Sequence, residues 1–357
     1  MQRQARSTSC RAAIAVLASV LVSATASAAP PVRVFVTTTD LGDLTRQVGG
    51  DRVTVSEMVR GRDDAHFAEA RPSFIKLLSE ADLFVQVGLD LEVGYVPVLL
   101  QNARNARVLP GAPGFVDAST AIVPLDIATS DVDRSMGDVH VAGSPHYLLD
   151  PVRGLEVASL LARKLSEQRP EDQAYFQERL GRLRQRLATA LVGETLAAKY
   201  DAFKLAVLHE RGALGDFLAQ QGDRASLSGW LGALLPFHGT KVVDDHAMWT
   251  YFARRFGLVV VDHLEPKPGI PPTTTHLRKV IDRMKEHRIR LIFASPYYDP
   301  RHATVVSGAT GARIVPLAHQ TGSRDGTGDY VSMLDYNVRT IAEALAASWS
   351  GAATSVD

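Results

Sequence analysis

Two stretches in which strand-like and helix-like segments alternate constrain the fold of this chain most. The apolar, β-branched runs predict strands at 32–38, 53–59, 83–87 and near Val108, and then at 204–208, 241–243, 258–261, 290–294 and 313–317. The segments between them predict helices at 41–48, 73–79, 94–104, 247–256, 273–287 and 330–349. Such alternation is typical of parallel sheets with helices on both faces. We therefore expect an α/β fold of two lobes, each with a central, mainly parallel sheet flanked by helices.

The stretch between these two regions, residues 152–199, consists almost entirely of helix formers. Its leucines recur at helical spacing, and Pro170 divides it into a shorter helix and a long one over residues 170–199. At 1.5 Å per residue the long helix would span about 45 Å, enough to cross a domain. We expect an N-terminal lobe at 29–165, a linking backbone helix at 166–200 and a C-terminal lobe at 201–357. A single packed helix would resist wide hinge bending, so we expect small local shifts around a ligand.

The first 28 residues have the pattern of an export signal. Three arginines precede an apolar run at 12–22 that is too short to span a bilayer. The small residues Ala26, Ser27 and Ala28 then form a cleavage pattern, and we expect cleavage near Ala28. The single cysteine, Cys10, lies before the apolar run, so we expect neither a lipid anchor nor a thiolate ligand in the mature chain.

The charge balance excludes several classes of partner. The whole chain has 39 basic and 39 acidic residues, and removal of the three signal arginines leaves 36 against 39. There is no basic stripe for nucleic acid and no second long apolar run for a membrane. We expect a soluble, exported, globular monomer.

Three histidines occur where ligands are usually presented, next to strand ends or helix starts. His66 follows the run at 53–59, His146 lies in Gly-Ser-Pro-His before a helix, and His246 follows Val242-Val243. One histidine in such a place is more often a capping or surface residue. Three together favour a metal site, because neutral imidazole is the commonest protein ligand for a borderline divalent metal. The other histidines, His140 and His319 excepted, are interpreted as structural.

Several segments, in order along the mature chain, carry a resemblance to a known family. They are 49–53, 64–73, 81–92, 144–151, 246–258, Pro300-Arg301 and 337–345. The chain resembles the periplasmic metal-binding receptors of zinc and manganese ABC importers. The resemblance implies two α/β lobes joined by one backbone helix, a periplasmic location and no enzyme activity. It implies a membrane permease as partner and leaves a periplasmic metallochaperone open as another.

By this resemblance His66, His146 and His246 match the family's three nitrogen ligands. Members that favour manganese tend to place a glutamate at the third position, whereas zinc receptors place a histidine, as His246 is here. The chain is therefore expected to be a high-affinity receptor that delivers Zn(II) to an ABC importer. A receptor for manganese or another divalent metal is the alternative. A periplasmic zinc-dependent hydrolase, with Asp64 or Asp245 as the base, is a further one.

The fourth ligand is where the sequence departs from the family, which usually supplies an aspartate after the last strand. Alignment on Gly322 puts His319 at that place, while Asp325 and a water molecule remain alternatives. Glu265 is a candidate partner for a ligand imidazole. The loop 126–140 contains Asp131, Asp133, Asp138 and His140. We interpret it as a solvated loop, with weak metal capture through His140 as the alternative.

Overall fold

The computed structural model describes residues 29–127, 140–266 and 270–353. The expected signal peptide therefore lies outside the described residues, as do Asp131, Asp133 and Asp138. Residues 31–357 group into one unit by their contacts. Within the described ranges, no helix has the length and apolar character needed to cross a membrane.

A sheet of four parallel strands forms the N-terminal lobe. Its strands are β1 (Val32–Val36), β2 (Val53–Glu57), β3 (Leu83–Gln86) and β4 (Phe115–Asp117), in the order β2-β1-β3-β4. Side chains alternate between the faces of β1, as the period of a strand requires. Val34 and Val36 point into the main apolar core, whereas Phe35 packs with Phe84 in a second cluster on the other face.

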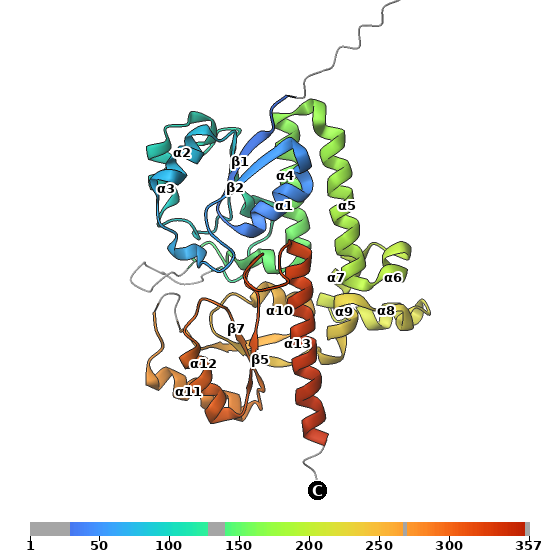
Figure 1. The fold of residues 1–357 in the computed structure, drawn as a ribbon. Coiled ribbons are helices and arrows are strands. Elements are labelled where there is room, and N and C mark those ends of the chain that lie inside the picture. Colours follow the sequence, from blue (N-terminus) through green and yellow to red (C-terminus); the bar gives the residue numbers. More distant parts are fainter. Residues whose placement is uncertain (1–28, 128–139, 267–269, 354–357) are drawn as a thin grey trace, which may run out of the picture. The chain divides into compact units, whose positions relative to one another are not determined.

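Helices cover both faces of this sheet. Helix α1 (Thr39–Gly49) shares the main core with α4 (Pro151–Gln168) and α5 (Gln173–Val192). Helices α2 (Pro72–Glu80) and α3 (Val96–Ala103) contribute to the second cluster. Figure 1 shows α2 and α3 on one side of β1 and β2, and α1, α4 and α5 on the other.

A second parallel sheet of four strands forms the C-terminal lobe with the same topology. Its strands are β5 (Lys241–Asp244), β6 (Val259–His263), β7 (Leu291–Ala294) and β8 (Arg313–Pro316), in the order β6-β5-β7-β8. Its helices are α10 (Thr250–Phe256), α11 (Thr274–Glu286), α12 (Pro300–Thr310) and α13 (Tyr330–Ala353). The predicted fold class, two parallel sheets flanked by helices, is confirmed.

Among the described residues, six α-helices lie between the two sheets along the chain. They are α4 (Pro151–Gln168), α5 (Gln173–Val192), α6 (Glu194–Lys199), α7 (Ala202–Glu210), α8 (Leu214–Gln220) and α9 (Gly229–Leu234). One apolar core runs from the N-terminal sheet through α4 and α5 to α10, α13 and the C-terminal sheet. The two sheets are thus connected by continuous packing as well as by the chain.

Two predicted strands and one predicted helix differ from the structure. The expected strand at 204–208 is helix α7, because the Asp201 side chain accepts hydrogen bonds from the Phe203 and Lys204 amides and caps a helix there. The expected strand near Val108 is a 3₁₀ turn, and the fourth strand, β4, begins at Phe115.

The expected long helix over 170–199 ends at Val192. Gly193 has a φ of +82°, outside the helical region, and a Cβ at this position would clash with the Ser228 side chain. A separate short helix, α6, follows. The lobe boundaries at residues 165 and 201 stay predictions.

Candidate metal centre

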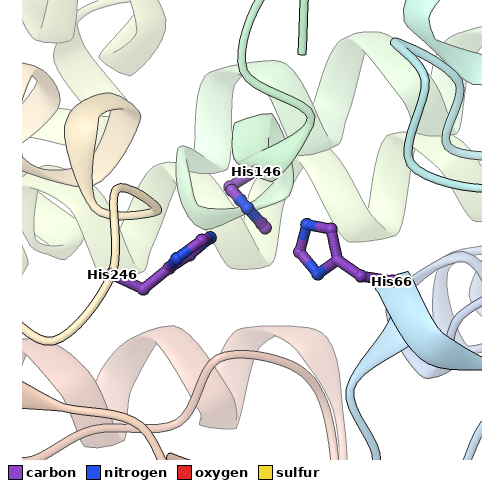
Figure 2. Close-up of side chains that lie close together, drawn as sticks. All are labelled: His66, His146 and His246. Carbon is purple, nitrogen blue, oxygen red and sulfur yellow. The ribbon is translucent and has the colours of Figure 1, made fainter. Parts of the chain in front are cut away.

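His66, His146 and His246 come together from three distant segments. His66 lies in a 3₁₀ turn (Ala65–Phe67) after β2, His146 begins a 3₁₀ turn (His146–Leu149) before α4, and His246 follows β5. One ring nitrogen from each lies within 4.8 Å of the others. Figure 2 shows the three rings converging on a common point. The carboxyl ends of parallel strands are where α/β proteins place ligands, and His66 and His246 follow this rule.

Carboxylates fix the orientation of two of these rings from behind. The His66 Nδ1 lies 2.7 Å from Asp64 Oδ1, and the His246 Nδ1 lies 3.0 Å from Glu265 Oε2. Asp64 also accepts a hydrogen bond of 2.9 Å from the backbone amide of His66, so the carboxylate holds both the turn and the ring. A carboxylate on Nδ1 leaves Nε2 as the metal-binding atom and raises its basicity. Glu265 therefore takes the position expected of it from the sequence.

Burial keeps the imidazole of His146 in the neutral form that binds metals. Burial, followed by the neighbouring histidines, lowers the pKa of His146 well below its ordinary value. The pKa of Asp64 is lowered: burial alone would raise it, but the hydrogen bonds from His66 outweigh burial. The buried His146 Nε2 has no hydrogen-bond partner among the described residues. A buried polar atom without a partner requires an explanation, and a nitrogen that binds a metal ion provides one.

A small cavity lies against two of the three histidines, His66 and His146. It has a volume of about 50 Å³ and is lined in part by His66, His146, His319 and Tyr297. Sites for organic ligands usually measure about 300–1,000 Å³, so this cavity fits a bare ion rather than a metabolite. A larger cavity of about 1160 Å³ shares Asp64 and Tyr297 with it, but His66, His146 and His246 do not line that larger space.

His319 and Asp325 occupy different environments. His319 lines the small cavity, but its Nε2 lies 3.3 Å from the Asp63 carbonyl oxygen, and its ring packs against Tyr297 at 4.6 Å between centroids. Burial lowers the pKa of His319 to about 4. Asp325 has a fully exposed side chain 3.6 Å from Arg62 Nη2. The role of His319 as fourth ligand stays a prediction.

His140 lies directly against the site, although from the sequence we expected at most a role in metal capture. Its Nε2 is 3.1 Å from His66 Nε2, and burial lowers its pKa to about 3. The contact joins residues 74 positions apart. The sequence signal that could have indicated it is a second histidine six residues before His146.

The two carboxylates suggested as a hydrolytic base are engaged elsewhere. Asp64 is bound to His66. Asp245 accepts hydrogen bonds from the Ser295 amide and hydroxyl, and burial raises its pKa to about 8. Neither carboxylate is therefore free to activate a water molecule at the histidine cluster.

Comparison with known proteins gives a match over most of the chain. The family model described as "Zinc-uptake complex component A periplasmic" (ZnuA) matches residues 34–204 and 230–344. The manganese ABC transporter substrate-binding lipoprotein PsaA of Streptococcus pneumoniae is 20% identical over 89% of this chain and 90% of its own length. The metal ABC transporter substrate-binding lipoprotein SloC of Streptococcus mutans is 22% identical over 87% of this chain and 89% of its own length.

Solved structures show the same fold. A crystal structure of ZnuA aligns with a TM-score of 0.64 at 22% identity, covering 88% of this chain and 98% of that one. The substrate-binding protein FpvC of Pseudomonas aeruginosa, in complex with Mn²⁺, aligns with a TM-score of 0.64 at 20% identity. The alignment covers 89% of this chain and 99% of FpvC.

Proposed function

Because the chain belongs to the family of periplasmic zinc-uptake components A, we propose that it is a zinc receptor that delivers Zn(II) to the permease of an ABC importer. The family comprises substrate-binding receptors of ABC transporters and not enzymes. The protein would act in the periplasm, bind the ion reversibly and release it to the membrane partner.

The convergence of His66, His146 and His246 is the observation that carries this proposal. Three imidazole nitrogens within 4.8 Å of one another need to approach by at most about 1.5 Å to reach the roughly 3.3 Å edge of a zinc tetrahedron with Zn–N bonds of about 2.0–2.1 Å. Asp64 and Glu265 supply the carboxylates that usually support such ligands. A site with protein ligands in every position binds an ion without activating water, as a transport receptor requires.

Manganese is the second candidate, because PsaA is named for manganese and FpvC was solved with it. The donor set argues against this choice. Manganese prefers carboxylate and carbonyl oxygen, whereas imidazole suits zinc. The two carboxylates at the cluster are bound to Nδ1 atoms of His66 and His246 rather than directed at the cavity as free ligands.

Metal titration of the mature protein tests this function. After removal of metal with a chelator, we expect one Zn²⁺ to bind, more tightly than Mn²⁺. Zinc at a hundred times its Kd should add about 2.7 kcal/mol to the free energy of unfolding. His146→Ala should weaken zinc binding by orders of magnitude and leave the fold intact, because His146 Nε2 makes no hydrogen bond among the described residues.

His287→Ala is the matched control, since His287 is an exposed histidine at the end of α11. It should bind zinc as the unaltered protein does. Tighter binding of Mn²⁺ than of Zn²⁺, or unchanged zinc affinity in His146→Ala, would contradict the proposal.

A further inference from the structure

We propose that His140 is the fourth zinc ligand, so that the ion is held by four neutral imidazoles. This inference rests on the proposed zinc-binding function and names a ligand that the sequence did not assign. From the sequence, His319, Asp325 and a water molecule were the alternatives for the fourth position.

The distance between His140 and His66 has the value that a shared ion requires. Their Nε2 atoms lie 3.1 Å apart. Two nitrogens bound to one tetrahedral zinc at about 2.0–2.1 Å are separated by about 3.3 Å. The His140 ring centroid also lies 5.2 Å from that of His66 and 6.2 Å from that of His146. His140 thus lies on the His66 side of the cluster, outside the group of three whose ring nitrogens are within 4.8 Å of one another, and its ring has to move toward His146 and His246 to complete the tetrahedron.

The backbone behind His140 is built to hold its ring in this orientation. The ring hydrogen-bonds to the backbone of Leu89. This contact helps to fix the position of the His140 ring, as Asp64 and Glu265 fix the rings of His66 and His246.

The turn that carries Leu89 has an unusual conformation that a buried carboxyl group maintains. Gly88, Leu89 and Asp90 have φ values of +83°, +52° and +66°. Left-handed backbone at residues other than glycine costs about 1–2 kcal/mol each and persists where the surroundings enforce it. Here Glu92, which is 2% exposed, accepts hydrogen bonds from the amides of Val87 (2.7 Å) and Gly88 (3.0 Å). The strained turn is thus fixed next to the ring that it orients.

His319 is less well placed for the same role. Its Nε2 lies near the Asp63 carbonyl oxygen, at 3.3 Å, rather than near a cluster histidine. The adjacent Gln320 donates hydrogen bonds of 3.1, 3.2 and 3.0 Å to the carbonyls of Arg60, Gly61 and Asp63, which anchors this loop. His319 Nδ1 is buried without a hydrogen-bond partner among the described residues, but its ring packs against Tyr297 and not against a cluster histidine. His140, in contrast, already contacts His66.

The test compares three single variants of the mature protein: His140→Ala, His319→Ala and the exposed control His287→Ala. Zinc affinity is measured by competition with a chelator, and the ligand set by the visible spectrum of the Co²⁺-loaded protein. Loss of supporting groups around a metal typically costs 10–100-fold in affinity, so loss of a direct ligand in His140→Ala should cost roughly 100-fold or more. Its Co²⁺ spectrum should also change. The other two variants should stay within about threefold of the unaltered protein, because neither removes a coordinating nitrogen.

The outcomes separate this inference from the function on which it rests. Unchanged zinc affinity and an unchanged Co²⁺ spectrum in His140→Ala, with zinc binding still lost in His146→Ala, would overturn the role of His140 and leave the receptor function intact. A slower zinc on-rate at unchanged affinity would also overturn it, because His140 would then capture the ion without holding it. Absence of zinc binding by the unaltered protein would refute the receptor function itself. Unfolding midpoints of the metal-free variants, compared by circular dichroism, show whether His140→Ala is folded.

Discussion

At the scale of single residues, the histidine cluster depends on the groups behind the rings. His246 is 1% exposed, and its ring is clamped between Glu265 at Nδ1 and the ring of Tyr298, whose centroid lies 5.2 Å away. Fixing a ring before the metal arrives removes the entropy cost of ordering it on binding. Glu265 also supplies negative charge next to a site whose own ligands are neutral.

Replacement of Glu265 with glutamine should therefore lower the zinc affinity about 10–100-fold without loss of the fold. Glutamine retains an oxygen that can accept the His246 Nδ1 hydrogen bond, but it lacks the charge that raises the basicity of the ring. Chelator competition measures the affinity. Glu286→Gln, which changes an exposed glutamate on α11, is the control and should have no effect. Equal affinities of the two variants would show that the Glu265 charge does not support the site.

The residues of the cluster differ in how far the sequence could indicate them. His66 and His246 follow strands, and the ends of parallel strands are where ligands are expected, so local patterns suffice. His140 could not be assigned in this way, because its contact with His66 spans 74 residues and its partner Leu89 belongs to yet another turn. Such contacts follow from the tertiary arrangement and leave no periodic signal in the sequence.

At the scale of elements, one buried ion pair ties the segment that carries His146 to helix α10. Arg255 on α10 donates hydrogen bonds of 2.8 and 2.9 Å to the two carboxylate oxygens of Asp150. Asp150 also caps α4 by accepting a bond of 2.9 Å from the Val152 amide, directly after the turn that begins at His146. Arg255 and Asp150 are 1% and 3% exposed. This pair therefore connects elements from both halves of the chain next to the cluster.

Arg255→Ala should destabilise the protein by about 3–5 kcal/mol, because the buried Asp150 carboxylate loses both hydrogen bonds from Arg255 and keeps only the longer ion pair with Arg153 at 3.8 Å. Urea unfolding of the metal-free protein measures the change. The neighbouring Arg254→Ala is the control, since Arg254 is exposed and its ion pair with Glu210 should be worth about 1 kcal/mol or less. A loss in Arg255→Ala no larger than that in Arg254→Ala would mean that the buried pair contributes little.

The elements themselves were predictable where the local pattern and the tertiary packing agree. Of the eight strands among the described residues, seven were expected near their observed positions, since each is a short run rich in apolar residues. The run at 204–208 is also apolar, but the cap at Asp201 and the burial of Leu205, Ala206 and His209 at helical spacing make it a helix. Short apolar runs carry too little periodicity to separate these two states, so the choice depends on capping and packing.

At the scale of the whole molecule, the loop after β8 joins the two sheets next to the cluster. Thr321 in this loop donates hydrogen bonds of 2.7 Å from its amide and 2.6 Å from its hydroxyl to Asp40 Oδ1, at the start of α1. In return, the Thr39 hydroxyl donates a bond of 2.7 Å to the Thr321 carbonyl oxygen. Contacts between residues about 280 positions apart hold this loop, and His319 within it, against the N-terminal lobe.

Asp40 should make the stability of this connection depend on pH. Burial raises its pKa to about 7, against the opposing hydrogen bonds from Thr321, and the nearby Asp43 and Glu57 raise it further. Between about pH 4 and pH 7 the folded protein therefore holds a proton on Asp40 that the unfolded chain has lost. The contribution of Asp40 to the free energy of unfolding is therefore fully present below about pH 4. It decreases as the pH rises and is lost once the pH passes the folded pKa of about 7. A shift of about three pKa units corresponds to about 4 kcal/mol over the whole window.

Asp40→Asn removes this titration while keeping an oxygen that can accept the Thr321 hydrogen bonds. The stability of the variant relative to the unaltered protein should therefore rise as the pH increases from 5 to 8. Urea unfolding of both metal-free proteins at several pH values measures the difference. The buried Glu92 and Asp245 also have raised pKa values, near 7 and 8, but they are present in both proteins and cancel from the comparison. A stability difference that does not vary with pH would show that Asp40 is ionised in the folded protein, and that the contact between α1 and the loop after β8 tolerates a buried charge.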